Sequence, residues 1–510
     1  MADKLAGRVR LAETVAGLER LEREISAWVE RRRAHDRLGQ YATPLATLEL
    51  TLTGAVRALR EEAGTLPADQ PVGERFAAAR VLDRRATLVR EVLTWFRAKF
   101  DQRDDAEVAG VLAAADEVVW SCWKEAFDSA ALGGDAVAER GPAPLPYLDP
   151  RGGAEAFVRD QPPPGLGASE ADQALGRFLV RLPVPVVRLP VGCLDTPWWL
   201  GLLAHEVGHH LQYDLLPELA LVAEVGEVVA GAVNGDPLEA ARWRGWSREL
   251  FADACALLAL GPAAIGVTLQ VELGGEATLL DGGRGRYPAP VVRLAFLAEL
   301  ARQLRLSPQD PLGGLDPALL TAPHAGGEAD GTTDSEPGIE PDDTKDGDPL
   351  AARRERARAD LERVPTVAAA LLQAPLGGLG PLPRLFRFKA ADHGALGRIA
   401  GWAEALEHGD ARPEPTLRAA REAAAGALLV WQRLAATADD AQRAEALGRL
   451  AGGLPPLLAG CREAATRAGE DARAPQDRGG ELAALLREAI PDATAAMDGD
   501  ADLDAGARVS

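Results

Sequence analysis

The sequence predicts a mainly α-helical protein with one small β-sheet, and two patterns carry this prediction. Apolar residues recur at steps of three and four over much of residues 1–133 and 350–490, which is the spacing of one face of an α-helix. Residues 178–191 (FLVRLPVPVVRLPV) instead mix β-branched residues with prolines, a pattern typical of short strands at a sheet edge. We therefore expect helical regions on both sides of a segment that contains the strands.

The composition is that of an ordinary globular protein. The chain has 510 residues, of which 47% are hydrophobic and 26% are charged, and a soft expectation of about 150 residues per domain predicts about three domains. Collagen-like, fully disordered and disulfide-scaffold classes would each need a strong deviation from these values. Lys and Arg number 56, whereas Asp and Glu number 77, so the net charge is −21. Because this charge repels phosphate backbones, we expect no nucleic-acid partner.

The cysteines and the N-terminal residues predict a cytoplasmic location. The four cysteines are scattered without a CxxC pair, which suits a reducing compartment better than a disulfide framework. The first 25 residues are charged throughout and lack the apolar segment of an export signal. The two most apolar stretches, 178–203 and 215–233, are interrupted by Pro and Arg or by Glu. We therefore expect no membrane span.

Residues 1–133 form the expected N-terminal helical region, which we predict to contain four helices. The apolar stripes cover residues 15–29, 45–64, 73–100 and 105–132. From 134 to 177 the composition shifts to proline- and glycine-rich runs, in which fixed φ angles and missing N–H donors prevent a continuous helix. We interpret 134–177 as a connecting loop.

Residues 178–305 contain the strands and then several helices, and we expect them to form the functional core. The strand at 185–189 lies just before the first helix, where an edge strand could bind an extended substrate; the alternative is a strand inside the sheet. That helix opens at Thr196-Pro197, a signature of an N-cap followed by a first-turn proline. Further helices are expected at 216–234 and 237–260 and after the prolines at 288 and 290.

The remaining residues contain an acidic loop, a second helical region and an acidic tail. Between residues 326 and 349 there are nine acidic residues, one Lys and no aromatic residue, so little apolar surface is available to offset the entropy of ordering. We predict a disordered loop at 306–349. Residues 350–490 return to helical spacing and form the C-terminal helical region, and residues 491–510 are the acidic tail.

The run HEVGHH at residues 205–210 contains three of the seven histidines of the chain. On a helix, His205 and His209 lie one turn apart on the same face and can present their imidazoles to one metal ion, while Glu206 can reach a water on that ion. Zinc sites of this kind have two imidazoles, a third ligand and an open position for water. His210 points about 100° away from His209, so we expect it either to support the site or to lie at the surface.

A second motif, Glu249-Leu-Phe-Ala-Asp253, provides candidates for the rest of the site. These two carboxylates are also one helical turn apart. Glu249 can act as the third zinc ligand, and Asp253 can accept the second N–H of a ligand histidine. The alternative is a solvated helix face, but the neighbouring residues are apolar on most sides, so the carboxylates need partners. An HExxHxxGxxH site is excluded, because Gln212 and Leu215 stand where its Gly and third His would be.

Together the two motifs resemble the gluzincin metallopeptidases, and most closely the group of the membrane-bound CAAX prenyl proteases and their bacterial heat-shock relatives. Those relatives carry a HExGH helix, an ExxAD helix and a His-Pro segment followed by Arg. Here Tyr287-Pro288 and Arg293 resemble the third segment, with Tyr in place of His. The resemblance covers residues of about 180–300 and implies a zincin-like catalytic core with its small β-sheet. The membrane helices of those relatives are missing here.

The resemblance implies Zn²⁺ as the cofactor, His205, His209 and Glu249 as its ligands, and Glu206 as the general base. An oxyanion donor is also needed. Tyr287 is the favoured candidate, and an ordinary half-buried tyrosine is the alternative. Tyr147 and His393 are the other donors that the sequence offers. Arg293 is expected to orient its segment or to pair with Asp253, and a surface salt bridge is the alternative.

The function that follows is a zinc metallopeptidase, with an endopeptidase as the expected class and a protein or peptide as the substrate. The helical flanks leave much of the chain for substrate selection or for a regulatory protein partner. The rival is a zinc-containing regulatory or partner-binding protein with little hydrolytic activity, although zinc binding alone does not require Glu206. A third interpretation is a helical scaffold in which the motif arises by chance.

Overall fold

The computed structural model confirms the mainly α-helical class. The described residues are 2–67, 70–131, 142–150, 153–157, 184–233, 236–282, 287–306, 350–387, 393–435, 439–462 and 475–491. The predicted acidic loop, apart from residue 306, and the acidic tail, apart from residue 491, lie outside these residues. None of the helices in the described ranges is long and apolar enough to cross a membrane.

The chain divides into two compact units. One contains residues 1–119, 139–194 and 463–510, and the other contains residues 120–138 and 195–462. The boundaries fall inside helix α4 (Ala106–Ala131) and just before the segment with the HEVGHH run. The expected functional core at 178–305 is therefore shared between the two units, with its strand in the first and its helices in the second.

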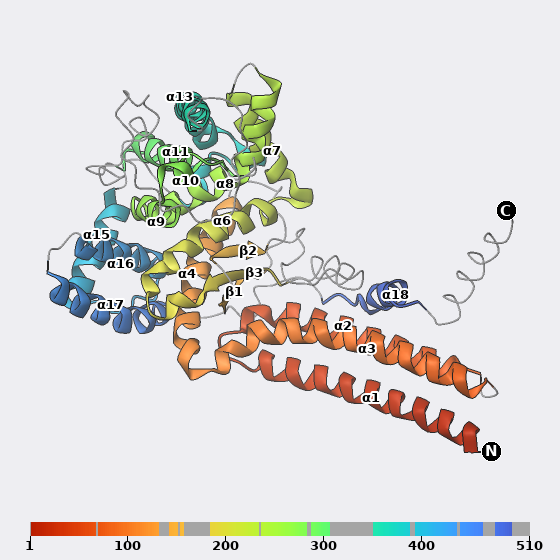
Figure 1. Cartoon of the computed structure of the whole chain (residues 1–510). Helices are drawn as coiled ribbons and strands as arrows, with labels where there is room; N and C mark the ends of the chain where they lie inside the picture. The colour runs from red at the N-terminus through yellow and green to blue at the C-terminus, as the bar shows by residue number, and fades with distance from the viewer. Residues whose placement is uncertain are drawn as a thin grey trace, which may run out of the picture. The chain divides into compact units, whose positions relative to one another are not determined.

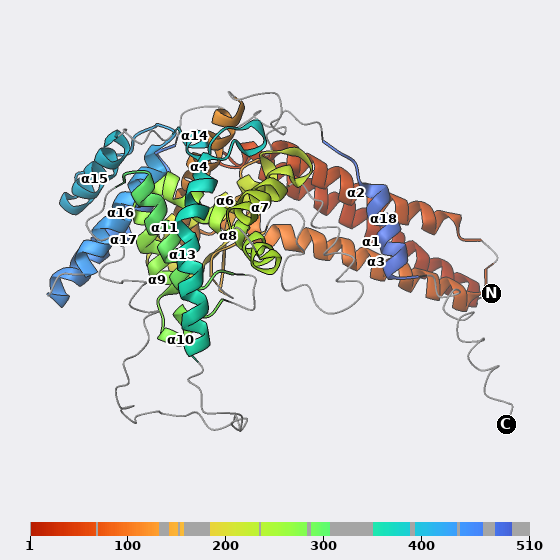
Figure 2. The ribbon, with the colours of Figure 1, turned by 90° about the horizontal axis from the view of Figure 1, so that it is seen from above.

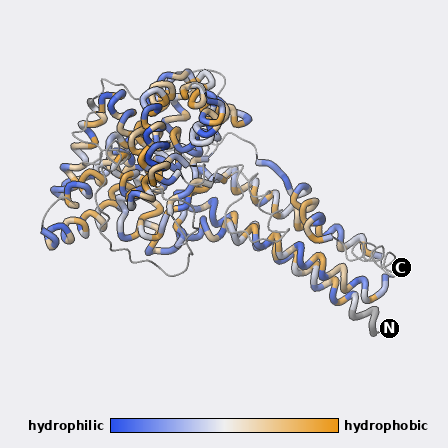
Figure 3. The backbone as a smooth tube through the Cα atoms, turned by 45° about the horizontal axis from the view of Figure 1, so that its top comes forward, coloured by the Kyte–Doolittle hydropathy of each residue, from blue (hydrophilic) through white to orange (hydrophobic). Residues whose placement is uncertain are grey.

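Long helices dominate the first unit. Helices α1, α2, α3 and α18 lie side by side in Figures 1 and 2, and each contributes apolar side chains to one continuous core. Their bounds are Ala2–Arg33, Ala42–Thr65, Val72–Phe100 and Gly479–Ala489. With α4, the N-terminal residues form the four predicted helices. Hydrophobic and hydrophilic positions alternate along these helices with the period of the turn, as Figure 3 shows.

A three-stranded sheet also belongs to the first unit. Its strands are β1 (Leu145–Asp149), β2 (Glu155–Phe157) and β3 (Val186–Pro190), in the order β1-β3-β2. Strand β3 pairs parallel to β1 and antiparallel to β2. Two expectations differ from this result: β1 and β2 come from the predicted connecting loop, and β3 is the central strand. Because both sides of β3 are already paired, it offers no open edge to a substrate.

The helices of the second unit follow the predicted order. The HEVGHH segment begins as the 3-10 helix η4 (Pro197–Leu202) and continues as α6 (Leu203–Asp214). Next come α7, α8, α9, α10 and α11, with bounds Ala220–Ala232, Pro237–Leu260, Ala263–Glu272, Glu276–Leu279 and Pro290–Gln303. The C-terminal helices of this unit are α13 (Ala351–Gln373), α14 (Leu382–Leu385), α15 (His393–His408), α16 (Ala419–Ala435) and α17 (Asp440–Gly460).

Helix α8 has clear start and stop signals and coincides with the predicted helix at 237–260. The side chain of Asp236 accepts a hydrogen bond from the backbone N–H of Leu238, and Pro237 occupies the first turn. The helix ends at Gly261, which has φ = 61° and lies in a region that favours glycine. From residue 250 to residue 260 every side chain is buried, so the second half of α8 runs through the core of the unit.

Candidate metal centre

Two helices of the second unit, α6 and α8, bring the motif residues together. Gly208 of α6 lies against α8: a Cβ atom at this position would be 2.8 Å from Cα of Ala252 and 3.0 Å from Cβ of Cys255. Only a residue without a side chain allows the two helix backbones to approach this closely. The close approach places His205 and His209 of α6 opposite Glu249 of α8. Asp253 lies one turn after Glu249 on the same helix.

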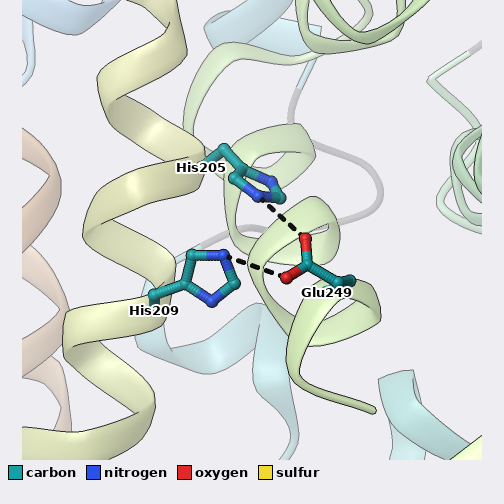
Figure 4. A group of neighbouring side chains, drawn as sticks. All are labelled: His205, His209 and Glu249. Atoms are coloured by element: carbon teal, nitrogen blue, oxygen red, sulfur yellow. Dashed lines mark ion pairs between the residues drawn. The ribbon is translucent and has the colours of Figure 1, made fainter. Parts of the chain in front are cut away.

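The imidazoles of His205 and His209 both face the carboxylate of Glu249, each toward a different oxygen, as Figure 4 shows. Glu249 Oε2 lies 3.4 Å from Nε2 of His205, and Oε1 lies 3.6 Å from Nε2 of His209. One donor atom from each residue lies within 4.8 Å of the others. In the described part of the chain, these three residues form the group of His, Cys, Asp and Glu side chains with metal-ligand spacing.

The donor atoms suit a zinc ion in their chemistry, and they lie within 4.8 Å of one another. Tetrahedral zinc with bonds of about 2.0–2.1 Å to N and O ligands places its ligand atoms about 3.3–3.4 Å apart. Each oxygen of Glu249 lies at about this distance from one histidine: Oε2 is 3.4 Å from Nε2 of His205, and Oε1 is 3.6 Å from Nε2 of His209. A tetrahedral ion held by two imidazole nitrogens and one carboxylate oxygen would keep a fourth position for water or substrate.

A second carboxylate supports the first histidine. Asp253 is completely buried, and its Oδ1 lies 2.9 Å from Nδ1 of His205. This contact places the Nδ1 proton between the two side chains and leaves Nε2 facing Glu249, as the ligand role requires. Arg293 of α11 donates to the same carboxylate from Nε at 2.9 Å and from Nη2 at 2.6 Å, and it also pairs with Glu272 of α9.

The electrostatics of the metal-free side chains follow from burial and these contacts. Burial alone would lower the pKa of His205, but the hydrogen bonds with Asp253 and Glu249 raise it to about 10. Burial lowers the pKa of His209 to about 4. Burial would raise the pKa values of Glu249 and Asp253, yet their histidine neighbours and Arg293 hold both below the usual range. Both carboxylates are thus ionised, and a metal ion must displace a proton from His205.

The structure assigns clear positions to the other predicted site residues. Glu206 is 7% exposed and lies on α6 between the two ligand histidines. His210 is 1% exposed, so the expectation of a surface position is wrong, and a supporting position remains. Tyr287 is 52% exposed in the segment just before α11. Tyr147 lies in β1 of the first unit, and the side chain of His393 is outside the described part of the chain.

Two features of the site were missed by the sequence analysis. Glu272, the last residue of α9, pairs with Arg293 from the side opposite Asp253, and no local pattern marks it. Gly208 is part of the HEVGHH run, and a glycine inside a helical pattern is a sign of close helix packing that could have been used. Nδ1 of His209, in contrast to that of His205, has no hydrogen-bond partner among the described residues.

Comparisons of the chain with protein-family models, with curated proteins and with solved structures found no match. The interpretation of the site therefore depends on its own geometry.

Proposed function

We propose that this protein is a zinc-dependent peptidase that hydrolyses peptide bonds in a protein or peptide substrate. The observation that supports this function is the convergence of His205 and His209 on the carboxylate of Glu249, where Nε2 of His205 lies 3.4 Å from Oε2 and Nε2 of His209 lies 3.6 Å from Oε1. The contact of Asp253 with Nδ1 of His205 also supports this function, because zinc enzymes use such a carboxylate to fix the tautomer of a ligand histidine. We assign the protein to the cytoplasm, since its four cysteines are all unbridged.

The chain's own residues supply the proton transfers of hydrolysis. Zinc, when bound, supplies Lewis acidity, which polarises a substrate carbonyl and makes water a nucleophile at neutral pH. Glu206, one residue after the first ligand, accepts the proton of the attacking water and delivers it to the leaving amine. Asp253 and Arg293 hold His205 in place while charge develops. For the oxyanion donor we keep Tyr287, which is 52% exposed and lies just before α11, the helix of Arg293.

A second candidate is a zinc-containing protein that binds a regulatory partner and hydrolyses little. The observation that favours it is the limited access to the ligands: the side chains of His205, His209 and Glu249 are only 17%, 10% and 13% exposed. A peptide must reach these atoms in an extended form for cleavage. The two candidates differ in turnover and share the metal.

Zinc content and peptide cleavage, measured together on variants, separate the candidates. The wild type should hold one zinc per chain, His205→Ala should lose it, and Glu206→Gln should keep it while losing cleavage of a proteome-derived peptide library. His408→Ala is the matched control, because this exposed histidine on α15 bonds only to a backbone carbonyl of its own helix. Stoichiometric zinc without any cleavage would favour the partner-binding protein, and absence of zinc after reconstitution would exclude both.

A further inference from the structure

A small cavity in the second unit lies at the end of α14, where α15 and α16 also begin. Its volume is about 30 Å³, and the arginines Arg387, Arg418 and Arg421 are part of its lining. Most of the remaining wall is apolar and includes Leu258 of α8 and Leu396 of α15. Arg421 is buried, so its charge is little screened by water, whereas Arg387 is exposed.

The three arginines have too few carboxylates to balance them. Glu125 of α4, whose side chain is 1% exposed, accepts a hydrogen bond of 2.6 Å from Nε of Arg418 and a second, short one from Arg421. Arg387 donates to the neutral hydroxyl of Ser129 at 3.2 Å. Among the described residues, three guanidinium groups therefore share one carboxylate here.

The other acidic residue of the lining does not correct this imbalance. Glu422 is bound on both oxygens by Arg398, at 2.8 to 3.0 Å, and so is neutralised by an arginine of its own. Arg421 is 3% exposed, and its Nε has no hydrogen-bond partner among the described residues. A buried guanidinium with an unused donor is costly unless a ligand completes its bonds.

Two helix N-termini add to the positive potential of the cavity. Helix α16 begins at Ala419, so Arg421 lies in its first turn, and α15 begins at His393, so Ala395 lies in its first turn. The N-terminus of a helix carries a partial positive charge and favours a negative charge beside it. Two such ends and three arginines surround the same small space.

We propose that this cavity binds a small inorganic anion between Arg387, Arg418 and Arg421. The anion accepts a hydrogen bond from Nε of Arg421. It also balances the positive charge of the three arginines that Glu125 alone does not neutralise. The cavity volume of about 30 Å³ limits the size of the anion. One ion such as chloride or phosphate suits this volume, whereas a larger organic acid is excluded. This site is independent of the proposed zinc chemistry, and it stabilises the packing of α4 against α16.

The test compares thermal unfolding of the full-length protein in different sodium salts at one ionic strength. Gluconate, which is too large for the cavity, is the reference, and chloride and phosphate are the two probes. We expect a saturable rise in Tm of about 3 °C or more with at least one probe, since a ligand that binds only the folded state stabilises it. The probe that acts at the lower concentration identifies the anion.

Two arginine variants show whether the effect belongs to this cavity. Arg387→Gln should reduce the rise in Tm by at least half, and it should fold because Arg387 is exposed and its side chain, among the described residues, bonds to Ser129 alone. Arg384→Gln, an exposed arginine of α14 outside the lining, should respond like the wild type. The proposal is overturned if neither probe raises Tm above the gluconate value, or if the two variants respond alike.

Discussion

Asp253 of α8 links His205 of α6 to Arg293 of α11. It is completely buried, and its Oδ1 lies 2.9 Å from Nδ1 of His205 and accepts a hydrogen bond of 2.6 Å from Nη2 of Arg293. A buried carboxylate with two such partners is ionised, so it orients the histidine and holds α11 against α8 at the same time. In the proposed zinc site, Asp253 would position a ligand rather than bind the metal.

Replacing Asp253 with Asn should weaken zinc binding about 10- to 100-fold, because a neutral amide holds the Nδ1 proton of His205 less strongly than a carboxylate does and loses the ion pair with Arg293. A competition titration with a chelator measures this change. Asp360→Asn is the control: Asp360 is 2% exposed and is bonded by Arg242 on α8, but it lies on α13 outside the ligand set. Both variants should lower Tm, and equal zinc affinities in the two would contradict the positioning role.

The buried cysteines predict a pH dependence for thiol reactivity. Burial raises the pKa of Cys122 to about 11 and that of Cys193 to about 12, so both thiols stay protonated in the folded protein at pH 8. The native protein should react with a thiol reagent far more slowly than the protein unfolded in guanidinium. Above about pH 9 the unfolded thiols ionise and the folded ones do not, so stability should fall as pH rises. Fast labelling of the native protein at pH 8 would disprove the predicted protection of the thiols.

Among the elements, the pair α6 and α8 determines whether a metal site exists at all. Each helix carries two motif residues one turn apart, but the donor atoms meet only because the helices touch at Gly208. A larger residue there would have to displace the backbone of Ala252, which cannot rotate away as a side chain can.

Gly208→Ala should therefore cost about 1–3 kcal/mol in the free energy of unfolding, as overpacked positions do, and should lower zinc occupancy by separating the ligands. Gly231→Ala on α7 is the matched control, because nothing lies within 4 Å of a Cβ atom placed there. It should be neutral or stabilise the protein by up to about 1 kcal/mol, since Ala is the better helix former. Chemical denaturation and metal analysis measure both effects, and full zinc content in Gly208→Ala would refute the argument.

At the scale of the molecule, the first unit is assembled from segments that lie far apart in the chain. Helix α18 packs its apolar face on α2, with Leu482, Ala483 and Leu486 buried. Next to it, Arg85 of α3 donates to the backbone carbonyl of Ile490 at 3.0 and 2.7 Å. The N-terminal helices thus depend on residues at the opposite end of the sequence.

Removal of residues 475–510 should lower the Tm of the first unit, because the loss of two buried leucines alone corresponds to about 3–6 kcal/mol. The zinc content should not change, since the metal centre belongs to the second unit. A shorter truncation that removes only residues 492–510 keeps α18 and is the control. Circular dichroism and metal analysis test the prediction, which fails if the two truncations unfold at the same temperature.

The sequence by itself determined the helices and the candidate ligands. Helix periodicity, caps and the i, i+4 spacing are local properties, so the bounds of α8 and the pairing of His205 with His209 on one face could be predicted. The choice of Glu249 as their partner was a hypothesis from chemistry, and the packing of α6 on α8 places the three together.

Only the tertiary structure decided which distant residues meet. The strands β1 and β2 form within a proline-rich segment because β3 supplies hydrogen-bond partners that no local pattern predicts. The pairing of Arg293 with both Asp253 and Glu272, the docking of α18 on α2 and the cluster of arginines around one cavity are also contacts between residues far apart in the chain. Such contacts depend on shape and burial across the whole core, whereas sequence patterns report only what neighbouring residues favour.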